Sequence, residues 1–141
     1  MKTLIIIALA VVLLAACSKA ISASSSEGQA SGSQAAITFV DARGAAQMIA
    51  ERDDLTVIDV RTPREFESGH IEGAINIDFK ARDFAEQLSR IDPDKAYLIH
   101  CRSGGRSKAS LRSFKALNFT NITHMDGGTI GWNAARLPLT Q

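Results

Sequence analysis

Apolar residues along the chain alternate between short β-branched runs and segments with helical spacing. The strand-like runs occupy residues 37–40, 56–60, 74–77, 97–100 and 121–125. Apolar residues three or four positions apart follow Asp41, surround Phe84, extend from Gly105 to Leu117 and surround Trp132. Strand–helix alternation of this kind predicts right-handed βαβ units. We therefore expect an α/β fold with a mainly parallel five-stranded sheet flanked by helices on both faces.

The N-terminus departs from this pattern. Lys2 precedes thirteen uninterrupted apolar residues, Leu4 to Ala16, which as a helix would span about 20 Å. That is short of a hydrocarbon core of about 30 Å, so residues 1–16 are predicted to be a secretory signal peptide rather than a membrane span.

The end of this segment, Leu14-Ala15-Ala16-Cys17, resembles the bacterial lipobox. The resemblance implies cleavage before Cys17 and lipidation of that residue. The expected location is thus the periplasmic side of the cell envelope, anchored by lipid. Ser18 after the cysteine is the pattern that enteric lipoproteins use for the outer membrane. The alternative is an ordinary signal peptide cut near Ala16, with Cys17 incidental.

The next segment is polar and has low complexity. Seven of the nineteen residues in 18–36 are serine, and no apolar face recurs. Such a composition cannot bury enough surface to offset the entropy of ordering. Residues 17–36 are therefore predicted to be a lipidated cysteine and a flexible tether. The folded domain is predicted to be 37–141, a common domain size.

The overall charge excludes one class of partner. The chain has 16 basic and 15 acidic residues, for a formal charge of +1, and loss of residues 1–16 removes one lysine. A nucleic-acid-binding protein needs a basic excess to displace counterions from phosphates, so we expect no nucleic-acid partner.

One loop concentrates the candidate chemistry. The segment His100-Cys101-Arg102-Ser103-Gly104-Gly105-Arg106-Ser107 joins the carboxyl end of a hydrophobic strand to a helix start. Adjacent glycines let backbone N–H groups converge, and the helix start adds unpaired N–H groups and a positive dipole end. Positive potential favours a thiolate, so Cys101 is a candidate nucleophile in an anion-binding loop. The alternative is a buried structural cysteine beside solvated arginines.

Residues 37–141 resemble a single-domain rhodanese. The motifs are Val57-Ile58-Asp59-Val60-Arg61-Thr62-Pro63-Arg64-Glu65-Phe66, Gly69-His70-Ile71-Glu72-Gly73-Ala74-Ile75-Asn76-Ile77, the Cys101 loop, and Asp126-Gly127-Gly128 with Trp132. The family usually has a glycine shortly before its last proline. Ala135-Arg136-Leu137-Pro138 lacks it, which leaves the C-terminal turn unassigned.

The resemblance implies sulfur transfer through a persulfide on catalytic Cys101. A small anionic donor such as thiosulfate would supply the sulfur, and cyanide, a thiol or a partner protein would accept it. The binding residues would be Arg102, Ser103, Gly104, Gly105, Arg106 and Ser107. Backbone N–H groups would hold the persulfide charge, and the guanidinium groups of Arg102 and Arg106 would orient the donor. No cofactor or metal is expected.

Two other functions remain open. Cysteine phosphatases and arsenate reductases have similar loops with C-x5-R spacing, whereas Cys101 and Arg106 are in C-x4-R spacing and Ser107 occupies the next position. One residue fewer suits a sulfur atom better than a phosphoryl group. A persulfide carrier or sulfur-sensing module without turnover would use the same residues as the enzyme.

The other polar candidates are predicted to be structural. Asp59 and Arg61 are expected to form a buried pair that holds a loop, and His70 to brace a turn. His100 should point away from the Cys101 thiol, because successive strand residues face opposite sides. His124 has no evident partner in the sequence, and Trp132 is expected to lie in the core.

Overall fold

The computed structural model describes residues 36–141. The predicted signal peptide, the lipidation site Cys17 and nearly all of the predicted tether lie outside the described residues. The strands are β1 (Ala36–Val40), β2 (Leu55–Asp59), β3 (Ile75–Asn76), β4 (Ala96–His100) and β5 (Asn121–Met125). The helices are α1 (Ala42–Glu51), α2 (Pro63–Glu67), α3 (Phe84–Ser89), α4 (Gly105–Ala116) and α5 (Gly128–Ala134).

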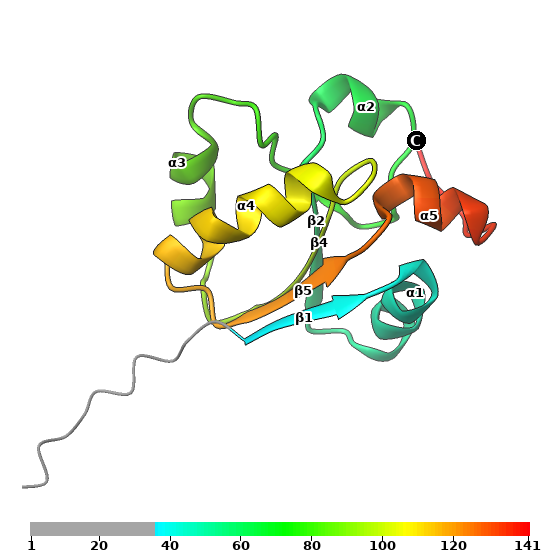
Figure 1. The fold of residues 1–141 in the computed structure, drawn as a ribbon, viewed down its shortest axis with the longest axis horizontal. Helices are drawn as coiled ribbons and strands as arrows, with labels where there is room; N and C mark the ends of the chain where they lie inside the picture. Colours follow the sequence, from blue (N-terminus) through cyan, green and yellow to red (C-terminus); the bar gives the residue numbers. More distant parts are fainter. Residues whose placement is uncertain (1–35) are drawn as a thin grey trace, which may run out of the picture. The chain divides into compact units, whose positions relative to one another are not determined.

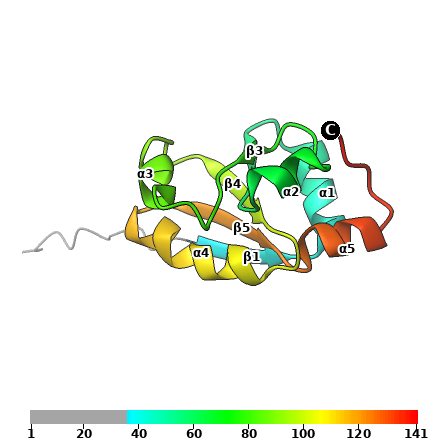
Figure 2. The same cartoon turned by 90° about the horizontal axis from the view of Figure 1, so that it is seen from above.

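The five strands form one parallel sheet in the order β1-β5-β4-β2-β3. Helices α1 and α5 cover one face of the sheet, and α3 and α4 cover the other (Figures 1 and 2). The predicted α/β fold is therefore confirmed. β4 lies at the centre of the sheet between β5 and β2, so the loop that follows it lies where ligands bind in such folds.

Two apolar cores fill the space between the sheet and its helices. Side chains of alternate strand residues divide between them, as the pleat requires. Ile58, Ile99 and Cys101 belong to the core under α3 and α4, which also contains Leu111 and Phe114. Val57, Leu98 and Trp132 belong to the core under α1 and α5. Cys101 and Leu98 thus point to opposite faces of the sheet.

The structure has one helix that the sequence pattern does not predict, and another that ends earlier than the apolar spacing of Phe84, Leu88 and Ile91 indicates. Helix α2 was not predicted, because the pair Thr62-Pro63 indicates the end of the preceding strand and does not by itself indicate a helix. Its N-terminus has a capping box in which Thr62 and Glu65 bond to each other's backbone N–H groups, with a proline in the first turn. The helix around Phe84 also ends earlier, at Ser89, so that Ile91 follows it and packs on the core from the loop.

Within residues 36–141, no helix combines enough length with enough apolar character to cross a lipid bilayer.

Candidate functional site

Cys101 follows β4 directly, and the first turn of α5 holds it in place. The backbone N–H of Thr129 donates to the Cys101 carbonyl at 2.9 Å, and that of Ile130 donates to the Arg102 carbonyl at 3.0 Å. This approach requires Gly128, because a Cβ there would overlap the Cys101 carbonyl oxygen. The Gly127-Gly128 motif therefore fixes the position of the Cys101 backbone.

The Cys101 sulfur lies inside the loop and accepts hydrogen bonds from it. The Gly104 N–H is 3.2 Å from Sγ and the Ser107 hydroxyl oxygen 3.5 Å. Gly104 reaches this position with a φ of 95°, which side chains rarely tolerate. Only 1% of Cys101 is exposed.

Two opposing effects set the pKa of the Cys101 thiol. Burial raises this pKa, because it disfavours the charged form. Hydrogen bonds from the Ser107 hydroxyl and from the backbone of Ser107, Ser103 and Gly104 stabilise the thiolate, and together they outweigh burial. The net pKa is below its usual value, so the loop favours a nucleophilic sulfur.

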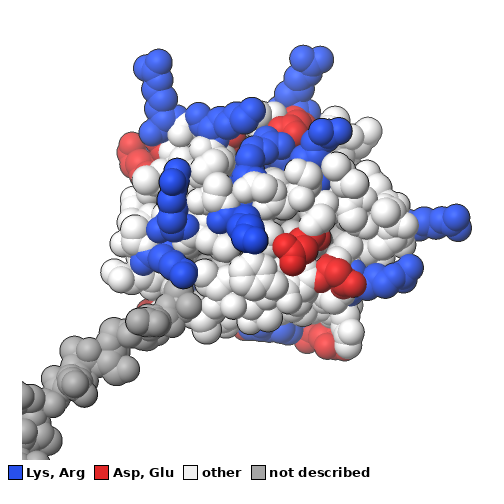
Figure 3. All heavy atoms as spheres, viewed as in Figure 1, with Lys and Arg blue, Asp and Glu red and all other residues white. Residues whose placement is uncertain are grey.

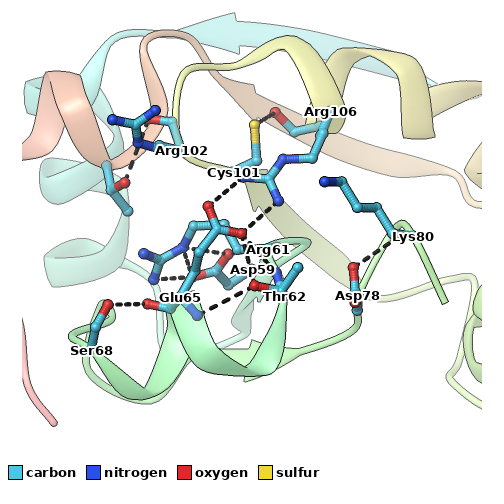
Figure 4. A network of polar contacts seen from close by, with 12 residues as sticks. Asp59, Arg61, Thr62, Glu65, Ser68, Asp78, Lys80, Cys101, Arg102 and Arg106 are labelled. Atoms are coloured by element: carbon cyan, nitrogen blue, oxygen red, sulfur yellow. Dashed lines mark hydrogen bonds and ion pairs between the residues drawn. The ribbon is translucent and has the colours of Figure 1, made fainter.

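Arg106 is paired with a carboxylate that the sequence analysis did not single out. Its two terminal nitrogens contact the Glu65 oxygens of α2 at 2.6 and 2.7 Å (Figure 4). The Arg106 hydrogen bonds, aided by Thr62, lower the pKa of Glu65 to about 2. The Thr62-x-x-Glu65 spacing, which is typical of a capping box, is the sequence feature that could have identified Glu65. The pair ties α2 to α4 beside Cys101.

The other predicted binding residues of the loop differ in how exposed they are to solvent. Arg102, Ser103 and Gly105 are exposed, whereas Gly104 and Ser107 are buried. Lys80 is also exposed, and its side chain extends toward Arg106 (Figure 4). Of the basic residues labelled in Figure 4, Arg102 and Lys80 are the two without an ion pair in the described part of the chain.

Asp59 and Arg61 form a buried ion pair that holds the loop containing Gly69, as predicted. Arg61 Nη2 lies 2.6 Å from an Asp59 carboxylate oxygen, and the same nitrogen donates to the Gly69 carbonyl at 2.8 Å. His100 is fully buried with Nε2 3.7 Å from Asp59, and burial lowers its pKa. Asp59, His100 and Leu98 occupy alternate positions that face α1 and α5, away from the thiol. The predicted buried pair of Asp59 and Arg61 and the predicted orientation of His100 are confirmed.

Two further side chains have the predicted structural positions. His70 forms a bridge with Thr140 and stacks on Phe66, with ring centroids 3.8 Å apart. Trp132 is buried and donates its indole N–H to the Pro138 carbonyl at 2.8 Å.

His124 does have a partner, which the sequence pattern did not indicate. It is fully buried, and its Nε2 lies 2.9 Å from the Ser107 hydroxyl and 3.2 Å from the Gly104 carbonyl. Both of these residues also contact Cys101. The parallel register pairs His124 with Ile99, two residues before Cys101, and so places both side chains on the same face.

The fold and the site define a class of protein: an α/β domain with a buried cysteine of lowered pKa in a loop of N–H donors. Among residues 36–141, no three His, Cys, Asp or Glu side chains are grouped so as to hold a metal ion.

Comparison with known proteins gives the family. Residues 32–135 match the family model described as the rhodanese-like domain, and the chain belongs to this family. A sulfurtransferase of Allochromatium vinosum is 28% identical over 73% of this chain and 94% of its own length. Thiosulfate sulfurtransferase 16 of Arabidopsis thaliana is 35% identical over 57% of this chain and 76% of its own length.

A solved structure gives the same family. The crystal structure of a rhodanese-related protein from Thermoplasma volcanium is 29% identical, covers 73% of this chain and 97% of its own, and has a TM-score of 0.64. These relatives support a sulfurtransferase of the rhodanese type.

Proposed function

We propose that the protein transfers a sulfane sulfur from thiosulfate, or a similar anionic donor, to cyanide or a thiol through a persulfide on Cys101. The observation that carries this proposal is the Cys101 sulfur, which accepts hydrogen bonds from Gly104 N–H and the Ser107 hydroxyl at the start of α4. The Arabidopsis relative is named a thiosulfate sulfurtransferase, which supports thiosulfate as the donor.

The first half-reaction forms the persulfide. The Cys101 thiolate attacks the outer sulfur of thiosulfate, and a new S–S bond forms as the original S–S bond breaks. Sulfite leaves with the electron pair of the broken bond. The persulfide keeps one negative charge, which the N–H groups of the loop stabilise.

The second half-reaction restores the thiolate. Cyanide or a thiolate attacks the outer sulfur of the persulfide and leaves with it, and the bond electrons return to Cys101. No redox cofactor takes part in either step. Arg102 and Lys80 are the exposed cations that would attract the anionic donor.

Burial of the thiol argues against phosphate chemistry. Only 1% of Cys101 is exposed, and the partly exposed Glu65–Arg106 pair lies beside it. A phosphomonoester would have to place its bulky tetrahedral centre within bonding distance of Sγ. The terminal sulfur of thiosulfate needs less room, and the short C-x4-R loop agrees with the smaller group.

The test is a sulfurtransferase assay with purified protein. Thiosulfate and cyanide should give thiocyanate, and after thiosulfate alone the Cys101 peptide should gain the mass of one sulfur atom. Cys101→Ser should abolish both results, whereas Lys115→Gln, at the far end of α4, is the matched control. Hydrolysis of a phosphotyrosine analogue without thiocyanate formation would contradict the proposal. A stable persulfide with negligible turnover would indicate a carrier instead.

We also propose that Cys17 carries lipid and holds the domain on the periplasmic side of the envelope, at the outer membrane. The support is the sequence Leu14-Ala15-Ala16-Cys17 followed by Ser18. Mass spectrometry of the protein isolated from cell envelopes should find an N-terminal acylated Cys17. Cys17→Ala should move the protein from the membrane fraction to the soluble fraction, and an unmodified, membrane-free wild-type chain would contradict the anchor.

A further inference from the structure

The polar contacts of the Cys101 sulfur continue through Ser107 to His124 on β5. Ser107 lies between the Cys101 sulfur at 3.5 Å and the His124 Nε2 at 2.9 Å. The Ser107 hydroxyl has one hydrogen, and three acceptors are within its reach: Sγ, Nε2 and the Gly104 carbonyl at 3.0 Å. Which of them receives the hydrogen decides whether Ser107 stabilises the thiolate.

The Gly104 carbonyl restricts this choice. A carbonyl oxygen has two lone pairs and only accepts hydrogen bonds. One lone pair accepts the Lys108 N–H at 2.9 Å, in the first turn of α4. His124 Nε2 lies 3.2 Å from the same oxygen, and a favourable contact there requires a hydrogen on Nε2. A bare Nε2 would instead place two electron-rich atoms against each other in a buried site.

The other ring nitrogen makes no directed contact. Nδ1 lies 3.2 Å from the Asp126 carboxylate but lacks a hydrogen bond of suitable geometry. The Phe39 ring packs against the imidazole, with ring centroids 5.3 Å apart, and restricts its rotation. The directed interactions of His124 are therefore those of Nε2, toward Ser107 and Gly104.

We propose that His124 is a positioning residue for Cys101: its Nε2–H occupies the Gly104 carbonyl and the Ser107 oxygen, which leaves the Ser107 hydrogen to donate to the sulfur. This inference rests on the proposed role of Cys101 as the nucleophile. His124 touches no reacting atom, and it acts on the sulfur through the Ser107 hydroxyl. Loss of the Nε2 donor would let Ser107 turn its hydrogen toward the Gly104 carbonyl, 3.0 Å away.

The test uses the pH dependence of Cys101 alkylation by iodoacetamide, followed on the Cys101 peptide by mass spectrometry. Charged groups near this chain of contacts are Asp126 after β5, Arg106 on α4, Glu65 on α2 and Asp59 below the loop; all are unchanged in the variants. Ser107→Ala and His124→Asn should each raise the midpoint of alkylation by about one pH unit, the effect of one hydrogen bond to a charged sulfur.

Two variants separate positioning from packing. His124→Gln places an amide N–H near the position of Nε2 and should restore the wild-type midpoint, whereas the shorter Asn does not reach it. The double variant Ser107→Ala/His124→Asn should shift no further than Ser107→Ala alone, because His124 acts through the hydroxyl. Additive shifts, or a midpoint that His124→Asn leaves unchanged, would overturn the proposal.

A measurement on the unaltered protein covers the case in which a His124 variant does not fold. Nitrogen-15 NMR of the histidine side chains should find a hydrogen on Nε2 of His124, and a bare Nε2 would overturn the proposal. None of these experiments uses a sulfur donor. Failure to form a persulfide would therefore count against the proposed function, and a negative result here would leave that function standing.

Discussion

Gly104 and Gly105 are adjacent in the loop but have different backbone conformations. Gly104 has a φ of 95°, and a Cβ there would lie 3.3 Å from the Gly127 nitrogen. A Cβ on Gly105 would meet nothing within 4 Å, and its φ lies outside the left-handed region. This difference could not be predicted, because a Gly-Gly pair in a sequence does not show which residue has the positive φ.

Alanine substitutions should separate these two residues. Gly104→Ala should cost about 1 to 3 kcal/mol of unfolding free energy, because a left-handed conformation strains any side chain. It should also reduce persulfide formation, since the Gly104 N–H donates to the sulfur. Gly105→Ala, the matched control, should be neutral or stabilise by up to about 1 kcal/mol through its better helix propensity. Urea unfolding measures both, and equal effects would contradict the assignment.

At the scale of elements, α2 and α4 are joined by the Glu65–Arg106 pair. Glu65 also caps α2 through the Thr62 N–H at 3.1 Å and the Thr62 hydroxyl at 2.9 Å. One carboxylate thus caps the start of α2 and anchors Arg106 beside Cys101. A capping box is visible in a sequence, but the distance from Glu65 to Arg106 depends on how α2 packs, which a local pattern does not give.

Replacement of Glu65 should change how stability depends on pH. Its pKa is about 2 in the folded protein and ordinarily 4.5, so its stabilising contribution is full above pH 4.5 and is lost as pH falls toward 2. Glu65→Gln should cost about 1 to 2 kcal/mol at neutral pH, allowing for solvent screening of a partly exposed pair, and the cost should shrink in acid. Glu67→Gln, exposed on the same helix, is the control. A cost that persisted unchanged at pH 2 would contradict the pairing.

The C-terminal turn, which the sequence left unassigned, is a Schellman motif after α5. Arg136 has a φ of 58°, its N–H donates to Asn133, and the Leu137 N–H donates to Trp132. Asn118 has the same role after α4 with a φ of 60°. Asparagine tolerates this conformation better than arginine does. The turn is thus formed without a glycine, at the cost of a left-handed conformation at Arg136.

Arg136→Gly should therefore stabilise the protein. Arg136 is exposed, so removal of its side chain sacrifices little packing, and glycine relieves left-handed strain of about 1 kcal/mol. Ala135→Gly, one residue earlier at an ordinary φ of −77°, should instead destabilise. Thermal unfolding of the two variants gives shifts of opposite sign if the turn is as described. A lower melting temperature for Arg136→Gly would contradict it.

At the scale of the whole molecule, the five strands and four of the five helices described in residues 36–141 could be predicted, but strand order and register could not. Alternating apolar runs identified all five strands and the loop after β4, because these signals are local. The pairing of Ile99 with His124 depends on packing among distant segments. His124 therefore looked unpartnered in the sequence, although it lies behind the Cys101 loop in the structure.

Charge is unevenly distributed on a molecule that is nearly neutral overall. Helix α4 carries four basic residues and no acidic one, and Lys and Arg side chains crowd the face around it in Figure 3. Because Glu65 neutralises Arg106, the attraction of the proposed anionic donor would depend on exposed cations, of which Arg102 is next to Cys101. A local positive field raises the concentration of anions near the site.

Arg102→Gln should therefore raise KM for thiosulfate about fivefold, roughly 1 kcal/mol, and affect kcat less. The difference from wild type should shrink as salt rises from about 0.01 to 0.15 M, since the Debye length falls from about 30 to 8 Å. Lys115→Gln removes an equal charge from the last turn of α4, where it is farther from Cys101, and should have a smaller effect on KM. Steady-state assays at both salt concentrations measure these changes. Equal effects of the two substitutions would show that the donor responds to the general field of α4, and would contradict a specific role for Arg102.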